Sequence, residues 1–209
     1  DLICVDDVSA ELAMGPNGAL VYCMEFLLQN IEWLEEKLEC YVDNDYLVFD
    51  LPGQIELYTH FPFMKDLVRK LESWGFRLQA IYMLDSQFMA DPAKFFGGSV
   101  TALSAMVQLE VSHINVMSKM DLVRGVDQSR LDEFFYTDIE TLVHELSHVV
   151  PRRFLRLNSA LGTLLDDFGM VQFVPLDVTD SDSVASLLLQ ADLALQYDEE
   201  IEPMFPKDL

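Results

Sequence analysis

Residues 45–56 read DYLVFDLPGQIE, a short apolar run that ends in an acid and leads into a Pro-Gly pair. The run over residues 45–50 predicts a buried strand, because an unbroken apolar stretch of this length is typical of strands covered on both faces. Asp50 then lies at the carboxyl end of that strand, and Gly53 follows three residues later. Open parallel sheets bind ligands just beyond the carboxyl ends of their strands, so this loop is the first candidate site.

Similar apolar runs alternate with helical periodicity along the rest of the chain. Further strands are predicted at 78–84, 114–117 and 170–174, and helices at 20–38, 62–75, 91–111 and 181–195, the last one capped by 181–183. Residues 127–167 predict a helical insertion with breaks near Thr137 and at Pro151. Strands that alternate with helices indicate an α/β fold, in which a parallel sheet is flanked by helices. We expect a single domain over residues 1–209, with a loose acidic tail at 197–209.

The chain is strongly acidic. Its 209 residues contain 36 Asp and Glu against 13 Lys and Arg, which gives a net charge of −23 and a pI near 4.2. Nucleic-acid binding and adsorption to an anionic membrane both need a basic surface, so neither is expected. A protein partner with a basic surface is compatible with this charge.

Hydrophobic residues make up 51% of the chain and the mean hydropathy is +0.17, so a folded core is expected and disorder is excluded. No apolar run approaches the roughly 18 residues that a membrane-spanning helix needs. The three cysteines show no CxxC spacing, which is typical of a reducing compartment.

The loop that begins at Asp50 has a spacing that suits phosphate chemistry. P-loop NTPases place an Asp at a strand end to hold Mg²⁺, and a Gly three residues later donates a backbone N–H to the γ-phosphate. Gln54, the next residue, is able to orient an attacking water. The alternative is a plain Pro-Gly turn that leaves a strand, and the short DxxG pattern alone does not exclude it.

A second loop, Ser118-Lys119-Met120-Asp121, follows the strand predicted at 114–117. A guanine ring needs a carboxylate that accepts from its N1–H and exocyclic amine, and a long aliphatic stem that covers its face. Asp121 and Lys119 supply these two groups. The alternative is a solvated Lys beside an Asp that caps a helix. Because both loops follow predicted strands in the order that GTPases use, together they favour guanine-nucleotide chemistry.

A third motif, Gly-Pro-Asn-Gly at 15–18, precedes the first long helix and on its own indicates only a turn. It occurs here as MGPNG at 14–18, together with DLPGQIELYTH at 50–60, DSQF at 85–88 and SKMDL at 118–122. This combination resembles the GPN-loop GTPases over essentially the whole chain. The resemblance implies a P-loop NTPase-like sheet in an enzyme that converts GTP to GDP and phosphate in the full-length protein.

The resemblance also implies a role for each motif. These GTPases dimerise, and the loop with Gly15, Pro16 and Asn17 is expected to reach into the partner's nucleotide site, where Asn17 contacts phosphate. By the same resemblance, Asp50 serves Mg²⁺ and Gly53 lies against the nucleotide. Gln54 and Glu56 handle the attacking water, and Ser118, Lys119, Met120 and Asp121 read the guanine.

The partners implied by the resemblance are another GPN-loop GTPase, the first eukaryotic paralogue, in a heterodimer, and RNA polymerase II subunits. The implied role is assembly of RNA polymerase II and its nuclear import. A cytoplasmic protein that shuttles to the nucleus is expected, with no direct contact to nucleic acid or membrane.

Two features depart from the family pattern. Its guanine motif often starts with Asn or Thr, whereas Ser118 keeps the hydroxyl on a shorter side chain. No GxxxxGK[ST] occurs in the sequence, although this loop supplies most backbone donors to the phosphates. We expect the chain as given to begin after that loop and after the first strand of the sheet.

Two other functions remain open at this stage. The chain could be a GTPase-like scaffold for assembly that has no catalytic activity. Residues 144–148, HELSH, also match the HExxH zinc-hydrolase pattern, in which two His bind zinc and a Glu acts as base. Asp166 or Asp167 could be a third zinc ligand, but their spacing does not require it.

Overall fold

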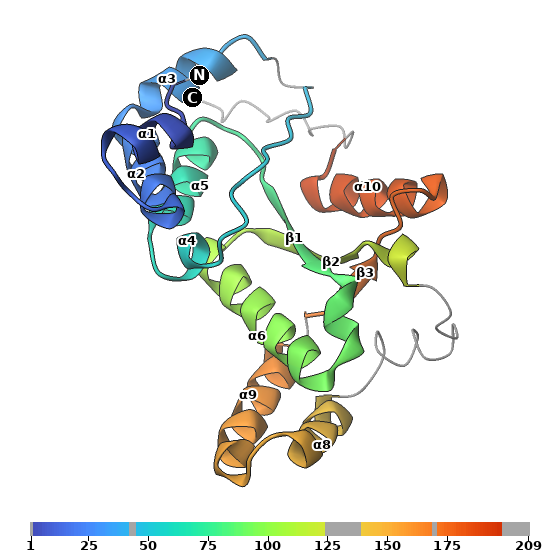
Figure 1. The fold of residues 1–209 in the computed structure, drawn as a ribbon. Coiled ribbons are helices and arrows are strands. Elements are labelled where there is room, and N and C mark those ends of the chain that lie inside the picture. Colours follow the sequence, from blue (N-terminus) through green and yellow to red (C-terminus); the bar gives the residue numbers. More distant parts are fainter. Residues whose placement is uncertain (1, 42–44, 124–138, 169–170, 198–209) are drawn as a thin grey trace, which may run out of the picture. The chain divides into compact units, whose positions relative to one another are not determined.

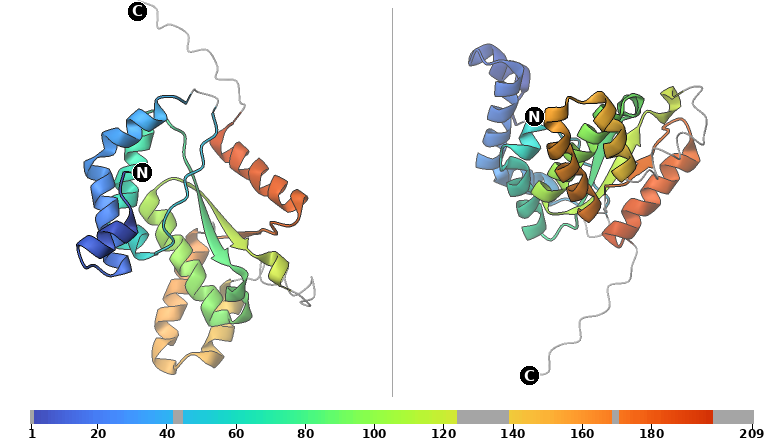
Figure 2. Two further views of the ribbon diagram at one scale, coloured as in Figure 1. Left: turned by 45° about the horizontal axis from the view of Figure 1, so that its top comes forward. Right: turned by 90° about the horizontal axis from the view of Figure 1, so that it is seen from below.

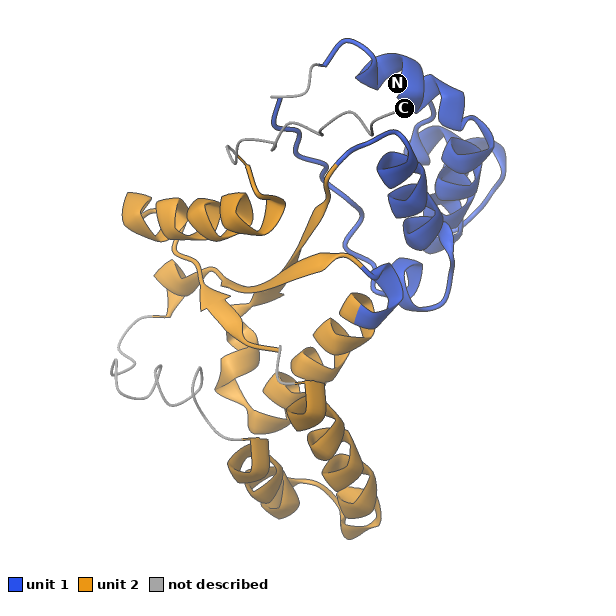
Figure 3. Ribbon diagram, turned by 180° about the vertical axis from the view of Figure 1, so that it is seen from behind, with its two compact units in different colours: residues 1–76, 107–110 blue, residues 77–106, 111–209 orange. Residues whose placement is uncertain are grey.

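The computed structural model describes residues 2–41, 45–123, 139–168 and 171–197. Two compact units emerge, one formed by residues 1–76 with 107–110 and the other by residues 77–106 with 111–209 (Figure 3). The expectation of one domain over 1–209 stays a prediction, since compactness of two units does not test whether either folds alone.

The second unit is built on a parallel sheet. Its strands are β1 (Gln79–Asp85), β2 (Ser112–Ser118) and β3 (Phe173–Pro175), in the order β1-β2-β3 (Figure 1). The register places Leu84 opposite Met117 and Asp85 opposite Ser118, so β1 and β2 end side by side. The predicted parallel α/β arrangement is therefore confirmed, and three of the four predicted strands are present.

Helices flank this sheet. α6 (Pro92–Leu109), α8 (Ile139–Val149) and α9 (Leu155–Phe168) pack on one face, and α10 (Ser181–Leu195) lies on the other (Figure 2). The core between the sheet and the first three helices contains these buried residues: Leu84, Met89, Phe95, Phe96, Ala102, Leu103, Met117, Leu142, Leu146, Leu165 and Phe173. The helical insertion is confirmed over 139–168, with its break at Pro151. Residues 124–138, including the predicted break near Thr137, lie outside the described residues.

Short 3₁₀ turns follow the strand ends, namely η1 (Ser86–Ala90) after β1 and η2 (Met120–Leu122) after β2, and η3 (Arg152–Phe154) joins α8 to α9. The predicted cap of the last helix is shifted by one residue. Asp180 is the N-cap of α10, and its side chain accepts from the Asp182 N–H at 3.2 Å. The carboxylate reaches this donor from outside the helix, whereas Ser181 is already its first residue.

The first unit is helical, with α1 (Val5–Glu11), α2 (Pro16–Gln29), α3 (Ile31–Leu38), α4 (Glu56–Thr59) and α5 (Phe63–Ser73). The single helix predicted over 20–38 is wrong, because the chain leaves helical geometry at Asn30 (φ −118°, ψ 39°). The Asn30 side chain donates to the Phe26 carbonyl at 2.8 Å, a local bond that competes with the helical backbone pattern. Both helices nevertheless bury apolar side chains, since Met24, Ile31 and Leu38 are buried.

The strand predicted over 45–50 is also wrong. These residues have no regular secondary structure, and Val48 is 87% exposed. A strand forms only when a neighbour completes its hydrogen-bonded ladder, and within the described residues the ladders join β1, β2 and β3 alone. Asp50 therefore follows an extended exposed segment and does not lie at the end of a sheet strand.

Two adjacent glycines in α6 allow a matched test of core packing. A Cβ added at Gly97 would meet nothing within 4 Å, whereas one at Gly98 would lie 2.7 Å from Leu84 Cδ2 in the core. We expect Gly97→Ala to raise the free energy of unfolding by about 0.5–1 kcal/mol, because Ala favours helix. Gly98→Ala should lower the free energy of unfolding by about 1–2 kcal/mol, because the cost of overpacking against Leu84 outweighs the gain in helix propensity.

Urea denaturation of both variants checks this pair of predictions. Equal stabilisation by the two substitutions would show that Leu84 moves aside without cost, which contradicts the close packing of α6 on β1.

Candidate functional site

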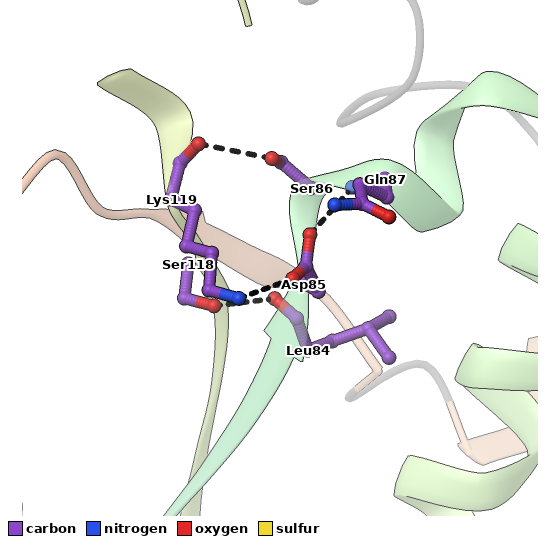
Figure 4. Close-up of polar contacts among 6 residues, drawn as sticks. All are labelled: Leu84, Asp85, Ser86, Gln87, Ser118 and Lys119. Atoms are coloured by element: carbon purple, nitrogen blue, oxygen red, sulfur yellow. Dashed lines mark hydrogen bonds and ion pairs between the residues drawn. The ribbon is translucent and has the colours of Figure 1, made fainter. Parts of the chain in front are cut away.

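The neighbouring ends of β1 and β2 carry a connected set of polar side chains (Figure 4). The Ser118 hydroxyl donates to the Leu84 carbonyl at 3.1 Å. In the opposite direction, the Ser86 hydroxyl donates to the Lys119 carbonyl at 2.9 Å. These two bonds join residues more than 30 positions apart in the sequence, so they fasten the loop after β2 to the loop after β1.

An ion pair lies between the same two loops. Lys119 Nζ is 2.7 Å from Asp85 Oδ2, and the other oxygen, Asp85 Oδ1, accepts from the Gln87 N–H at 2.9 Å. The hydrogen bond from Lys119 lowers the pKa of Asp85, and the same bond raises the pKa of Lys119. Both shifts favour the charged forms, so both groups are charged near neutral pH.

The backbone of Lys119 is unusual. Its φ of 59° and ψ of 36° lie in the left-handed region, where a residue with a Cβ is strained. Exposed ion pairs contribute little to stability, and the Lys119 side chain is 57% exposed. The arrangement of Lys119 is thus better explained by the orientation of its side chain than by a gain in stability.

Met120 and Asp121 continue this loop into η2. The Met120 N–H donates to the Leu176 carbonyl at 3.1 Å, and the Leu176 N–H donates to the Met117 carbonyl at 2.8 Å. Asp121 is partly exposed on η2. The loops after all three strands therefore meet at one end of the sheet, with Lys119 and Asp121 at its surface.

Two parts of this site were missed by sequence reasoning. In the sequence, Asp85 stands out only as the first residue of the DSQF motif at 85–88, because the cation that it pairs with is 34 residues away. The second part is the loop after β3. There the Asp177 carboxylate accepts from both the N–H and the hydroxyl of Thr179, at 2.7 and 2.6 Å. The short Asp-x-Thr spacing is the signal that could have revealed this turn.

The remaining predicted residues lie in the first unit. Asp50 and Gly53 are exposed, and Glu56 is the first residue of α4. Gln54 Oε1 is buried and has no hydrogen-bond partner among the described residues. The turn is held by Tyr58, whose hydroxyl donates to the Pro52 carbonyl at 2.7 Å. This leaves the Gln54 oxygen as an acceptor that a water could use.

The Gly-Pro-Asn motif begins α2. Gly15 is the N-cap, Pro16 is the first helical residue, and Asn17 is exposed in the first turn. No acidic residue lies in this turn, and Gly15, as the N-cap residue, has no side chain with which to cap it. The free N–H groups and the positive end of the helix dipole suit a negatively charged group.

The structure therefore brings Ser118, Lys119, Met120 and Asp121 together at the end of the sheet, in the second unit. Gly15, Pro16, Asn17, Asp50, Gly53, Gln54 and Glu56 belong to the first unit. Their predicted roles in one nucleotide site stay predictions.

The HExxH pattern lies on α8. His144 and His148 are exposed, and their ring centroids are 5.0 Å apart. Asp166 and Asp167 are exposed on α9. Within 2–41, 45–123, 139–168 and 171–197, no three His, Cys, Asp or Glu side chains form a group that could hold a metal ion. In the same ranges no helix is long and apolar enough to cross a membrane.

Comparison with known proteins agrees with this architecture. A family model described as "Conserved hypothetical ATP binding protein" matches residues 1–197. A Dictyostelium discoideum protein named GPN-loop GTPase 3 is 46% identical over 207 residues, which cover 99% of this chain and 72% of that protein. The Saccharomyces cerevisiae protein of the same name is 45% identical over 212 residues, covering 100% and 78%.

A solved structure is similar as well. The crystal structure of a GTPase in apo form from Pyrococcus abyssi superposes with a TM-score of 0.69 at 21% identity, over 92% of this chain and 75% of that one. At this identity the likeness concerns the fold alone, and it agrees with the predicted α/β class, a parallel sheet flanked by helices.

Proposed function

The chain belongs to the GPN-loop GTPase family, and from this premise we propose that it binds GTP and hydrolyses it to GDP and phosphate. The observation that carries the proposal is the loop after β2, where Lys119 is held in a strained conformation beside Asp121. An oriented lysine stem and a partly exposed carboxylate are the two groups that a guanine ring requires. The family model's description names ATP, but an adenine ring would offer this carboxylate no N1–H.

Two glycines support phosphate binding. Gly15 and Gly53 both lie outside the positive-φ region, and a Cβ at either position would meet no atom of the described residues within 4 Å. Neither glycine is therefore required by the packing or the backbone of this chain. Glycine at an exposed loop does, however, allow a phosphate to approach the backbone closely.

The loop from Asp50 to Glu56 is proposed to act on the γ-phosphate. Asp50 offers one exposed carboxylate, which fits Mg²⁺ because this ion is usually held by one or two carboxylates together with phosphates and water. When bound, Mg²⁺ would neutralise charge on the phosphates. Gln54 is proposed to orient the attacking water with its Oε1, which has no hydrogen-bond partner in the part of the chain that the structure describes, and Glu56 is proposed to assist it.

Gln54→Leu tests this role. We expect kcat for GTP hydrolysis to fall about tenfold, the effect of losing one hydrogen bond in the transition state, while the Kd for GTP changes less than twofold. Gln108→Leu, an exposed glutamine of α6, is the matched control and should change neither value. Kd by nucleotide titration and single-turnover hydrolysis give the two quantities.

Equal losses of affinity and turnover in Gln54→Leu would argue against a role in water orientation. If the unaltered protein binds GTP but does not hydrolyse it, the alternative function, a non-catalytic assembly scaffold, is favoured.

The partner role is proposed on the family resemblance. The protein is proposed to form a heterodimer with another GPN-loop GTPase, the first paralogue, and to assist RNA polymerase II assembly and nuclear import from the cytoplasm. The net charge of −23 supports contact with proteins rather than with nucleic acid.

A further inference from the structure

The contacts of Asp85 point to a role beyond the nucleotide-binding residues themselves. We propose that Asp85 is a positioning residue for guanine selectivity, which holds the Lys119 ammonium away from Asp121 and so leaves the Asp121 carboxylate free for the base. This inference rests on the proposed function, since it concerns the same guanine site.

The carboxylate of Asp85 is well placed for this task. Both of its oxygens are occupied, one by Lys119 Nζ at 2.7 Å and the other by the Gln87 N–H at 2.9 Å (Figure 4). The Gln87 bond anchors the carboxylate to the first turn of η1, so the position of Asp85 does not depend on Lys119 alone. Its side chain is 25% exposed, against 57% for that of Lys119. The more buried partner therefore sets the position of the more exposed one.

Lys119 has a second acidic neighbour. Asp121 also attracts the Lys119 ammonium and adds to the rise of its pKa. Without Asp85, this flexible and strongly charged side chain would be drawn toward Asp121, the other carboxylate whose charge acts on it. If the Lys119 ammonium bound to the Asp121 carboxylate, it would compete with the guanine N1–H and exocyclic amine for the same oxygens.

The backbone supports the same arrangement. The left-handed conformation of Lys119 and the hydrogen bond from Ser86 to its carbonyl fix where the side chain begins. Asp85 fixes where the side chain ends. With both ends held, the aliphatic stem is ordered before the nucleotide arrives, so binding loses less conformational entropy.

The test compares Asp85→Asn with the unaltered protein. Asn keeps the size and the capping bond to Gln87 but removes the charge that holds Lys119. We expect the Kd for GTP to rise about tenfold, and the Kd for ITP to rise less, because ITP lacks the exocyclic amine. Asp85→Glu keeps the charge and should recover part of the affinity. Asp91 also accepts from a backbone N–H, that of Ala93 at the start of α6. Asp91→Asn is therefore the matched control and should leave both Kd values unchanged.

A double-mutant cycle separates positioning from a structural effect. In a Lys119→Met background, Asp85→Asn should change the Kd for GTP less than twofold, since no ammonium remains to be held. The same tenfold loss in both backgrounds, or equal losses for GTP and ITP, would overturn the inference. If the unaltered protein binds GTP and Asp85→Asn binds it equally well, the inference alone fails. Failure of the unaltered protein to bind GTP would overturn the proposed function together with it.

Discussion

Replacing Asp121 with Asn is expected to change the preference for GTP over XTP by about 10⁴. Guanine presents two donors, N1–H and the exocyclic amine, and both need acceptors. The Asp121 carboxylate offers two oxygens, whereas Asn offers one acceptor and one donor. Xanthine carries a carbonyl in place of the amine, so it matches Asn and is rejected by Asp. Sites that read buried polar pairs discriminate by about 10⁴–10⁵.

The measurement is the ratio of Kd values for GTP, XTP and ATP in the unaltered protein and in Asp121→Asn. Asp182→Asn, an exposed acid in the first turn of α10, has the same change of charge and should keep the preference for GTP. An unchanged GTP preference in Asp121→Asn would show that another group reads the base. The ratio is more informative than one affinity, because a general loss of folding lowers all three affinities together.

The sheet could be predicted because its strands carry their signal locally. Within the two long strands, the sequences AIYML at 80–84 and INVM at 114–117 are mostly apolar and lie between polar residues, and the two strands pair with each other in the second unit. Residues 45–50 have an equally apolar composition but no ladder among the described residues. Composition reports that a segment is able to form a strand, whereas pairing depends on residues far away in the sequence.

The candidate site shows the same limit. Lys119 and Asp121 were identified because a four-residue loop contains both groups that guanine needs. Asp85 could not be given its role, since its contact with Lys119 exists only after β1 and β2 align in register. The left-handed backbone of Lys119 was equally hidden, because nothing in a lysine side chain favours this conformation. The break between α2 and α3 at Asn30 was hidden as well. The apolar periodicity continues through this residue, whereas the break is accompanied by one local hydrogen bond from the Asn30 side chain.

Asn17→Ala is expected to lower GTP hydrolysis about 10²-fold in the partner subunit rather than in its own. Asn17 is exposed in the first turn of α2, where free N–H groups and the absence of acids suit a phosphate. Its amide is able to donate to the charge that develops on the transferred phosphate. Loss of one such donor typically lowers kcat by about 10²–10³. Ala has a high helix propensity, so the fold and the subunit's own affinity for GTP should be preserved.

The experiment uses heterodimers in which only one subunit carries Asn17→Ala. Turnover is assigned to one site at a time by pairing each subunit with a partner that is unable to hydrolyse GTP. Gln29→Ala, exposed at the other end of α2, is the matched control and should leave both sites active. A defect confined to the subunit that carries Asn17→Ala would mean that the loop acts within its own chain, and the proposed exchange of loops across the dimer would then be wrong. A defect confined to the partner requires Asn17 to cross the interface, because α2 and the affected nucleotide would belong to different chains.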